Sequence, residues 1–140
     1  MICTFFGHRD VPDEIEEKLY FLLTDLIENE NVDVFYVGNH GGFDNMVIRS
    51  LKKLKKIYPN IKYYVVLAYM PTKKIDYQDY SDTIYPDGLE KIPPRLAIIK
   101  RNEWMVNKSD CVVTYVTNEF GGAAKFKALA NKLKKKMYEI

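Results

Sequence analysis

The sequence predicts an α/β fold, namely a three-layer, Rossmann-like domain with a five-stranded, mainly parallel sheet. Strand-like apolar runs alternate with helix-like segments along the whole 140-residue chain. The segments between the strands are long enough for helical crossovers, which connect parallel strands and are right-handed. We expect the strand order 3-2-1-4-5. Because a chain of this length leaves little for a second domain, we expect a single domain over residues 1–140.

Three strands and two helices are expected in the first half of the chain. The apolar run 2–6 predicts a strand that ends at a glycine. A helix should follow over 10–29, because an aspartate can cap it and its apolar residues recur with helical spacing. The second strand is expected at 32–37, and the segment 43–57 has a helical apolar face that ends before a proline. Residues 61–68 are almost continuously apolar, which is typical of a strand buried on both faces.

The second half of the chain is less regular. Residues 70–92 contain prolines and a glycine among polar residues, with a short fourth strand expected at 83–85. Two prolines then begin a helix over about 95–108. The apolar run 111–116 predicts the fifth strand, and the last helix follows a glycine pair and has an apolar face that includes Met137.

Composition limits the classes of partner. The chain has 21 Lys and Arg against 19 Asp and Glu, a net charge of +2, which is too weak to indicate nucleic-acid binding by itself, and we do not expect a nucleic-acid partner. No run of about 18 apolar residues suggests a membrane span. Cys3 and Cys111 lie in apolar runs without metal-site spacing, which is typical of buried thiols in a reducing cytoplasm. We therefore expect a cytoplasmic protein with no membrane contact, metal or cofactor. The sequence does not decide whether the chain forms a homo-oligomer.

Three polar, glycine-containing loops should lie at the carboxyl ends of the strands, where open parallel sheets bind their ligands. A glycine turn that opens a helix presents backbone N–H groups and the positive end of the helix dipole, which suits phosphate. Both histidines lie in these loops and could contact a phosphate or a ribose. The candidate ligand-binding residues are Gly7, His8, Arg9, Gly38, Asn39, His40, Gly41, Gly42, Asn45, Arg101, Asn118, Gly121, Gly122, Ala123 and Lys125.

Asp44 and Glu119 are the candidate catalytic residues. In N-glycosidic cleavage, a carboxylate could stabilise an oxocarbenium-like transition state or activate water. Asp44 could equally cap a helix, and Glu119 could lie in solvent. If His8 and His40 face a phosphate, binding should favour their protonated forms, so affinity should rise as the pH falls through the histidine range.

Five segments carry a resemblance to a known family: FFGHRD (5–10), FYVGNHGGFD (35–44), AYMP (68–71), KRNEWMV (100–106) and YVTNEFGGAAKF (115–126). They resemble the SLOG superfamily, which includes the SMF/DprA and lonely-guy proteins, and in particular its small bacterial members that begin with a strand and Gly-His-Arg. The resemblance implies a Rossmann-like fold and a nucleotide or nucleotide-derived ligand. Lonely-guy members are phosphoribohydrolases with a PGGxGTxxE motif; the matching residues 120–128 keep the glycine pair but lack the catalytic glutamate.

These observations predict a protein that binds a nucleotide or nucleotide-derived phosphorylated ligand at the carboxyl ends of its strands, as a sensor or binding module. One alternative is an N-glycoside hydrolase that acts on a nucleoside monophosphate. The other is a single-stranded nucleic-acid binder, in which Tyr77, Tyr80 and Tyr85 stack on bases beside Lys73 and Lys74.

Overall fold

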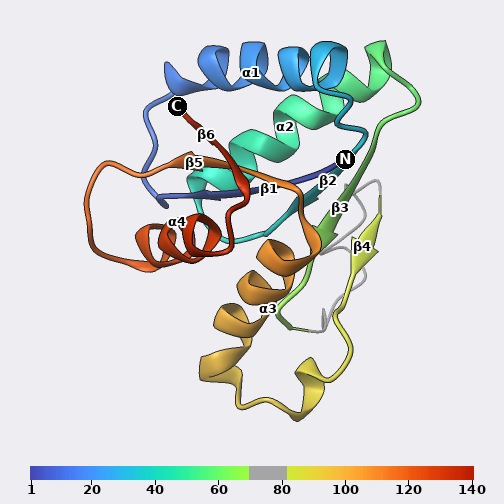
Figure 1. Cartoon of the computed structure of the whole chain (residues 1–140). Helices are drawn as coiled ribbons and strands as arrows, with labels where there is room; N and C mark the ends of the chain where they lie inside the picture. The colour runs from blue at the N-terminus through green and yellow to red at the C-terminus, as the bar shows by residue number, and fades with distance from the viewer. Residues whose placement is uncertain (70–81) are drawn as a thin grey trace.

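The computed structural model describes residues 1–69 and 82–140 and contains one sheet between two pairs of helices (Figure 1). Tyr77, Tyr80, Lys73 and Lys74, proposed above to contact bases, lie outside the described residues. In chain order the elements are β1 (Ile2–Gly7), α1 (Ile15–Asn29), β2 (Val34–Val37), α2 (Gly42–Ile57), β3 (Lys62–Val66), β4 (Thr83–Ile84), a 3-10 helix η2 (Leu89–Lys91), α3 (Pro94–Lys108), β5 (Cys111–Tyr115), α4 (Gly122–Lys132) and β6 (Lys136–Glu139).

The sheet has the order β4-β3-β2-β1-β5-β6, and each neighbouring pair is parallel. The Rossmann-like class expected from the sequence is confirmed, but the number and order of the strands differ from 3-2-1-4-5. β5, and not β4, lies beside β1, because most of its residues are buried and fit the centre of a sheet. β4 has two half-buried residues, which suit an edge.

The sixth strand replaces the end of a helix. The last helix was expected to include Met137, but α4 ends at Lys132. Lys134 adopts a positive φ of 59°, which an α-helix does not accommodate, and the chain turns back toward the sheet. Met137 then pairs with Val112 of β5 and packs on the core as a strand residue.

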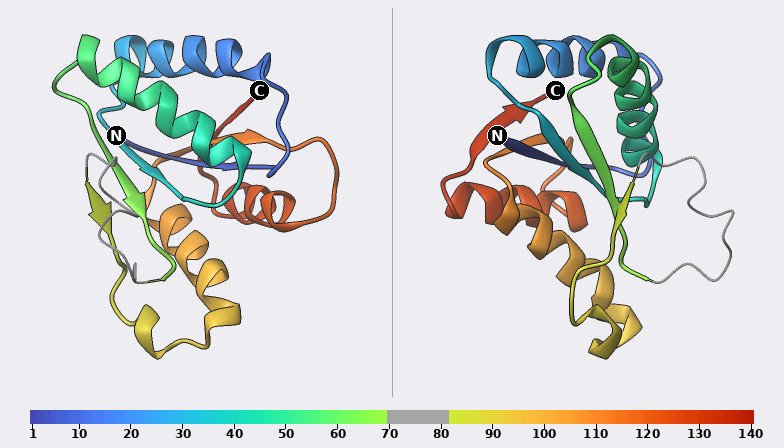
Figure 2. Two further views of the ribbon diagram at one scale, coloured as in Figure 1. Left: turned by 180° about the vertical axis from the view of Figure 1, so that it is seen from behind. Right: turned by 90° about the vertical axis from the view of Figure 1, so that its right-hand side faces the viewer.

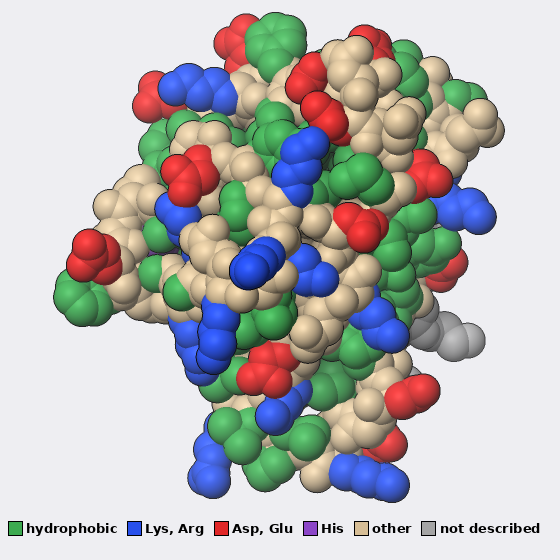
Figure 3. All heavy atoms as spheres, in the orientation of Figure 1, with side chains coloured by type: hydrophobic (Ala, Val, Ile, Leu, Met, Phe, Trp, Pro, Cys, Tyr) green, Lys and Arg blue, Asp and Glu red, His purple; other side chains and the backbone are tan. Residues whose placement is uncertain are grey.

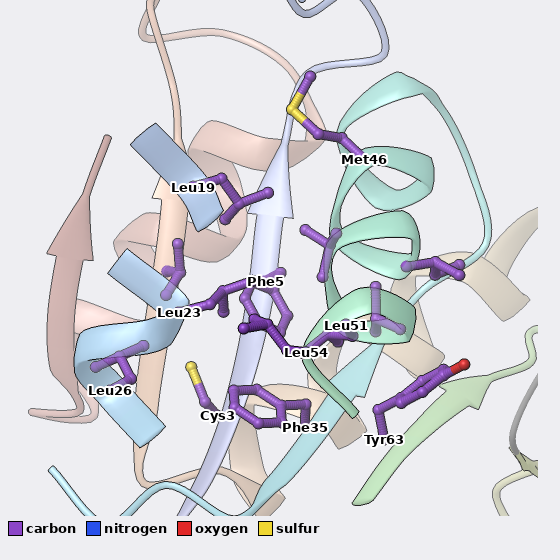
Figure 4. Close-up of a cluster of buried hydrophobic side chains, with 14 of the residues drawn as sticks. Cys3, Phe5, Leu19, Leu23, Leu26, Phe35, Met46, Leu51, Leu54 and Tyr63 are labelled. Carbon is purple, nitrogen blue, oxygen red and sulfur yellow. The ribbon is translucent and has the colours of Figure 1, made fainter. Parts of the chain in front are cut away.

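The core consists of two layers, one on each face of the sheet. α1 and α2 cover one face, and α3 and α4 cover the other (Figure 2). Successive strand residues point to opposite faces, so Phe5 contributes to the first layer and Phe6 to the second. Figure 4 shows side chains of the first layer, among them Leu19, Leu23 and Leu26 of α1, Leu51 and Leu54 of α2, and Cys3 and Phe35 of the sheet.

The segment between β1 and α1 is longer than expected. α1 begins at Ile15 and not near Asp10, because the preceding residues form a turn in which the Ile15 amide donates to the Pro12 carbonyl at 3.1 Å. Residues 8–14 therefore form a loop between β1 and α1, and the carbonyls of His8 and Arg9 accept hydrogen bonds from the first amides of α2. Within the described residues, no helix is long and apolar enough to cross a membrane. Acidic and basic side chains are interspersed over the face seen in Figure 3.

Candidate functional site

A cavity of about 400 Å³ lies at the carboxyl end of β1. β2, β3 and β4 follow one another on one side of β1, whereas β5 and β6 lie on its other side. The strand order therefore reverses between β1 and β5, which is where open parallel sheets bind ligands. The predicted site residues that line the cavity are Gly7, His8, Arg9, His40, Asp44, Arg101, Gly122 and Ala123. Phe5, Phe6, Ile98, Asn102 and Met105 complete the lining.

Arg101 of α3 forms the floor and is only 2% exposed. Its guanidinium donates hydrogen bonds to the loop after β2, to the last residue of β3 and to its own helix. The acceptors are Val66 O at 2.9 Å, Asn39 Oδ1 at 3.3 Å, Asn102 Oδ1 at 2.8 Å and His40 Nδ1 at 3.3 Å. Burial lowers the pKa of Arg101, and the nearby Asp44 carboxylate opposes this effect. Arg101 therefore fixes the loop after β2 against α3.

Asp44 lies in the first turn of α2, with its carboxylate at the cavity. Its Oδ2 accepts a hydrogen bond from the His40 amide at 3.0 Å. Burial raises the pKa of Asp44 to about 6, while that hydrogen bond and the Arg101 charge act in the opposite direction. Gly38 leaves the room this carboxylate needs, since a Cβ there would lie 2.8 Å from Oδ2.

The two histidines use their ring nitrogens differently from the expectation above. His40 Nδ1 faces an Arg101 N–H, so Nδ1 is the acceptor and Nε2 carries the proton. Burial, Arg101 and Arg9 lower the pKa of His40. His8 Nε2 accepts a hydrogen bond from the Thr117 amide at 2.8 Å, which leaves Nδ1 as the donor. The expected gain of affinity through protonated His40 therefore has no support, because this ring stays neutral near pH 7.

The two glycine turns have different neighbours. At the start of α2, the Gly42 amide donates to Arg9 O at 2.8 Å and the Phe43 amide to His8 O at 3.3 Å. These N–H groups are engaged within the protein. At the start of α4, by contrast, no described heavy atom lies within 4 Å of a Cβ built on Gly121 or Gly122, apart from the chain neighbours and the backbone of the helix itself. Gly122 lines the cavity, so the α4 turn is the one open to a phosphate.

The remaining predicted site residues are not in the lining of the cavity. Asn39 supports Arg101 from the loop after β2. Glu119 is exposed, whereas Asp44 lines the cavity, so the two candidate carboxylates do not form a pair there. The others that lie outside the lining are Gly38, Gly41, Gly42, Asn45, Asn118, Gly121 and Lys125.

Sequence reasoning missed the apolar wall of the cavity. Ile98 and Met105 line it together with Arg101 and Asn102. The four positions follow the i, i+3, i+4, i+7 spacing of one helical face, so this signal was present in the sequence. Phe120 was missed as well; its side chain is 82% exposed at the tip of the loop before α4.

Comparisons of the fold find DNA processing protein A. Its structure from Helicobacter pylori, described for a single-stranded DNA binding mode, superposes with a TM-score of 0.69 at 17% identity, over 99% of this chain and 64% of that one. The protein from Streptococcus pneumoniae superposes with a TM-score of 0.70 at 15% identity, over 98% of this chain and 49% of that one. The chain thus spans less than two thirds of either. No protein-family model and no curated protein matches the sequence.

The Helicobacter pylori structure corrects one expectation. Because the near balance of charges gave no sign of nucleic-acid binding, we expected no nucleic-acid partner. This expectation is wrong, because a protein of the same fold is described by its binding of single-stranded DNA. Net charge averages over the whole surface, whereas binding depends on the local field around one site.

Proposed function

We propose that this chain binds single-stranded nucleic acid, with one nucleotide of the strand seated in the cavity at the carboxyl end of β1, and that it belongs to the SMF/DprA side of the SLOG superfamily. The observation that carries the proposal is the cavity itself. Its volume of about 400 Å³ falls in the range of small-ligand pockets, and it combines apolar walls with a few convergent polar groups. The fold likeness to DNA processing protein A supports the same proposal.

The mouth of the cavity suits a phosphate of the strand. Arg9 is exposed there, and a guanidinium binds phosphate through paired N–H groups. Gly122 lies at the start of α4, where backbone N–H groups and the helix dipole attract an anion. Because both residues line the cavity, a phosphate at its mouth could bind to both groups.

Exposed aromatic side chains on both sides of the cavity favour a strand over a single nucleotide. Tyr69, 43% exposed, follows β3, and its ring forms a T-shaped pair with His40, with the ring centroids 6.2 Å apart. Phe120, 82% exposed, lies two residues before Gly122. Bases that neighbour the seated nucleotide could stack on these rings, as in many proteins that bind single strands.

Fluorescence anisotropy with a labelled DNA single strand and the matching duplex tests the proposal. The single strand should bind more tightly than the duplex. Arg9→Ala should weaken binding to every strand sequence, and the slope of log affinity against log salt concentration should fall in magnitude by about one. Arg49→Ala is the matched control, because Arg49 lies on α2 and pairs with Glu16 at 3.0 Å, away from the cavity. Equal binding of the duplex, or an unchanged affinity in Arg9→Ala, would count against the proposal.

A free nucleotide is the second candidate, and the buried polar floor favours it, since Asp44 and Arg101 could orient a whole small ligand. Phe120→Ala separates the two candidates. It should weaken strand binding about fivefold through lost stacking and leave mononucleotide binding unchanged. Release of free base from nucleoside monophosphates, abolished in Asp44→Asn, would instead support the hydrolase alternative.

A further inference from the structure

The floor of the cavity presents an acceptor and donors side by side. Asp44 supplies two carboxylate oxygens, of which Oδ2 already accepts one bond from the His40 amide at 3.0 Å. His40 Nδ1 accepts from Arg101, so its Nε2–H is a donor. Among the described residues, one N–H of Arg101 Nη2 has no acceptor, because the other contacts use Nε, Nη1 and the second Nη2 hydrogen.

The walls and the mouth decide which end of a nucleotide reaches this floor. Phe6, Ile98 and Met105 line the walls and offer apolar surface to the flat faces of a base. A phosphate would be repelled by the ionised Asp44 carboxylate and attracted to Arg9 and the α4 turn at the mouth. A nucleotide therefore enters base first, with the edge of its base on Asp44 and His40.

We propose that the base held in this cavity is guanine, an inference that rests on the proposed function. The guanine edge carries two adjacent donors, N1–H and N2–H₂, which match the Asp44 carboxylate, beside an acceptor, O6, which matches the donors of His40 and Arg101. Adenine and cytosine offer one amino group beside a ring acceptor. Thymine directs a carbonyl on either side of its single N–H, and one of these carbonyls would face the carboxylate.

The test compares DNA single strands that are identical except at one central position, which holds guanine, adenine, cytosine, thymine or hypoxanthine in a thymine background. Guanine should bind about tenfold more tightly than the other natural bases, as expected for one bidentate base contact. Hypoxanthine keeps N1–H and O6 but lacks the amino group, so the strand that contains it should bind less tightly than the guanine strand and more tightly than the other strands. These measurements use the unmodified protein and do not depend on a variant that folds.

Asp44→Asn should remove most of the guanine preference, because an amide offers one acceptor and a donor that meets the guanine N–H groups. Asp87→Asn, at an exposed aspartate outside the cavity lining, is the matched control. Equal affinity for all bases, a preference for another base, or a preference that survives in Asp44→Asn would overturn the guanine assignment and leave the proposed function standing. Absence of binding to every strand would instead refute the proposed function.

Discussion

The glycine turns before α2 and α4 have the same Gly-Gly sequence and nearly the same backbone conformation, yet they have different roles. Gly41 has φ and ψ of 100° and 175°, and Gly121 has 97° and 178°. The first turn is covered by the loop after β1 and bonds to it, whereas the second is open toward the cavity. A glycine pair at a helix start therefore predicts the backbone conformation of the turn. The neighbouring segments determine whether its N–H groups are hydrogen-bonded within the protein or can bind a ligand.

The covered turn is part of the support of the site. Its bonds to His8 O and Arg9 O hold the loop that carries two cavity-lining side chains. Gly7 extends this contact, because a Cβ there would lie 2.3 Å from the Phe43 ring. We therefore expect changes at the α2 turn to act on stability and changes at the α4 turn to act on binding.

The largest expected effect on the α2 side is the pH dependence of stability that Asp44 imposes. Its pKa rises on folding from the ordinary value near 3.8 to about 6. The folded state thus holds this proton more tightly, so the stability that the group contributes is complete below about pH 4 and is lost as the pH rises through 6. This loss amounts to at most about 3 kcal/mol.

Asp44→Asn removes this titration and keeps an oxygen that can accept from the His40 amide. The free energy of unfolding of the variant, relative to the natural sequence, should therefore rise by up to about 3 kcal/mol between pH 4 and pH 8. Urea denaturation at both pH values measures it, with the exposed Asp87→Asn as a control that should show no such change. A constant difference between the natural sequence and Asp44→Asn would mean that the Asp44 carboxyl is not desolvated.

Alanine substitutions at equivalent positions sharpen the comparison between the turns. A Cβ on Gly42 would lie 2.4 Å from Arg9 O, so Gly42→Ala should destabilise the protein by about 2 kcal/mol. Gly122 has open space, and Gly122→Ala should raise stability by about 0.5 kcal/mol through its helix propensity. Chemical denaturation measures both variants. Similar losses in the two would show that the α4 turn is also enclosed.

The sequence was informative wherever a local pattern decides the outcome. Alternating apolar segments predicted the parallel sheet, and polar loops at strand ends predicted that Arg9 and His40 would lie at one site. Strand order depends on which strand buries more of its side chains. β5 is more buried than β4 and therefore lies nearer the centre of the sheet. Likewise, no local pattern shows that Arg9 O would occupy the Gly42 amide, because the two residues are brought together only by the packing of β1 on α2.

A charged substitution at the open turn separates the effect on binding from the effect on stability. Gly122→Asp places a carboxylate where we propose that a phosphate binds, so affinity for a single strand should fall about tenfold through charge repulsion. Stability should not fall, because an acidic side chain in the first turn of a helix complements the dipole and the site has room for it. Anisotropy titration and denaturation of the same sample separate the two effects, and Gly122→Ala, which keeps the backbone N–H and adds no charge, serves as the control. If Gly122→Asp binds the strand as well as Gly122→Ala does, the phosphate does not lie at the α4 turn. Arg9 alone would then have to hold it.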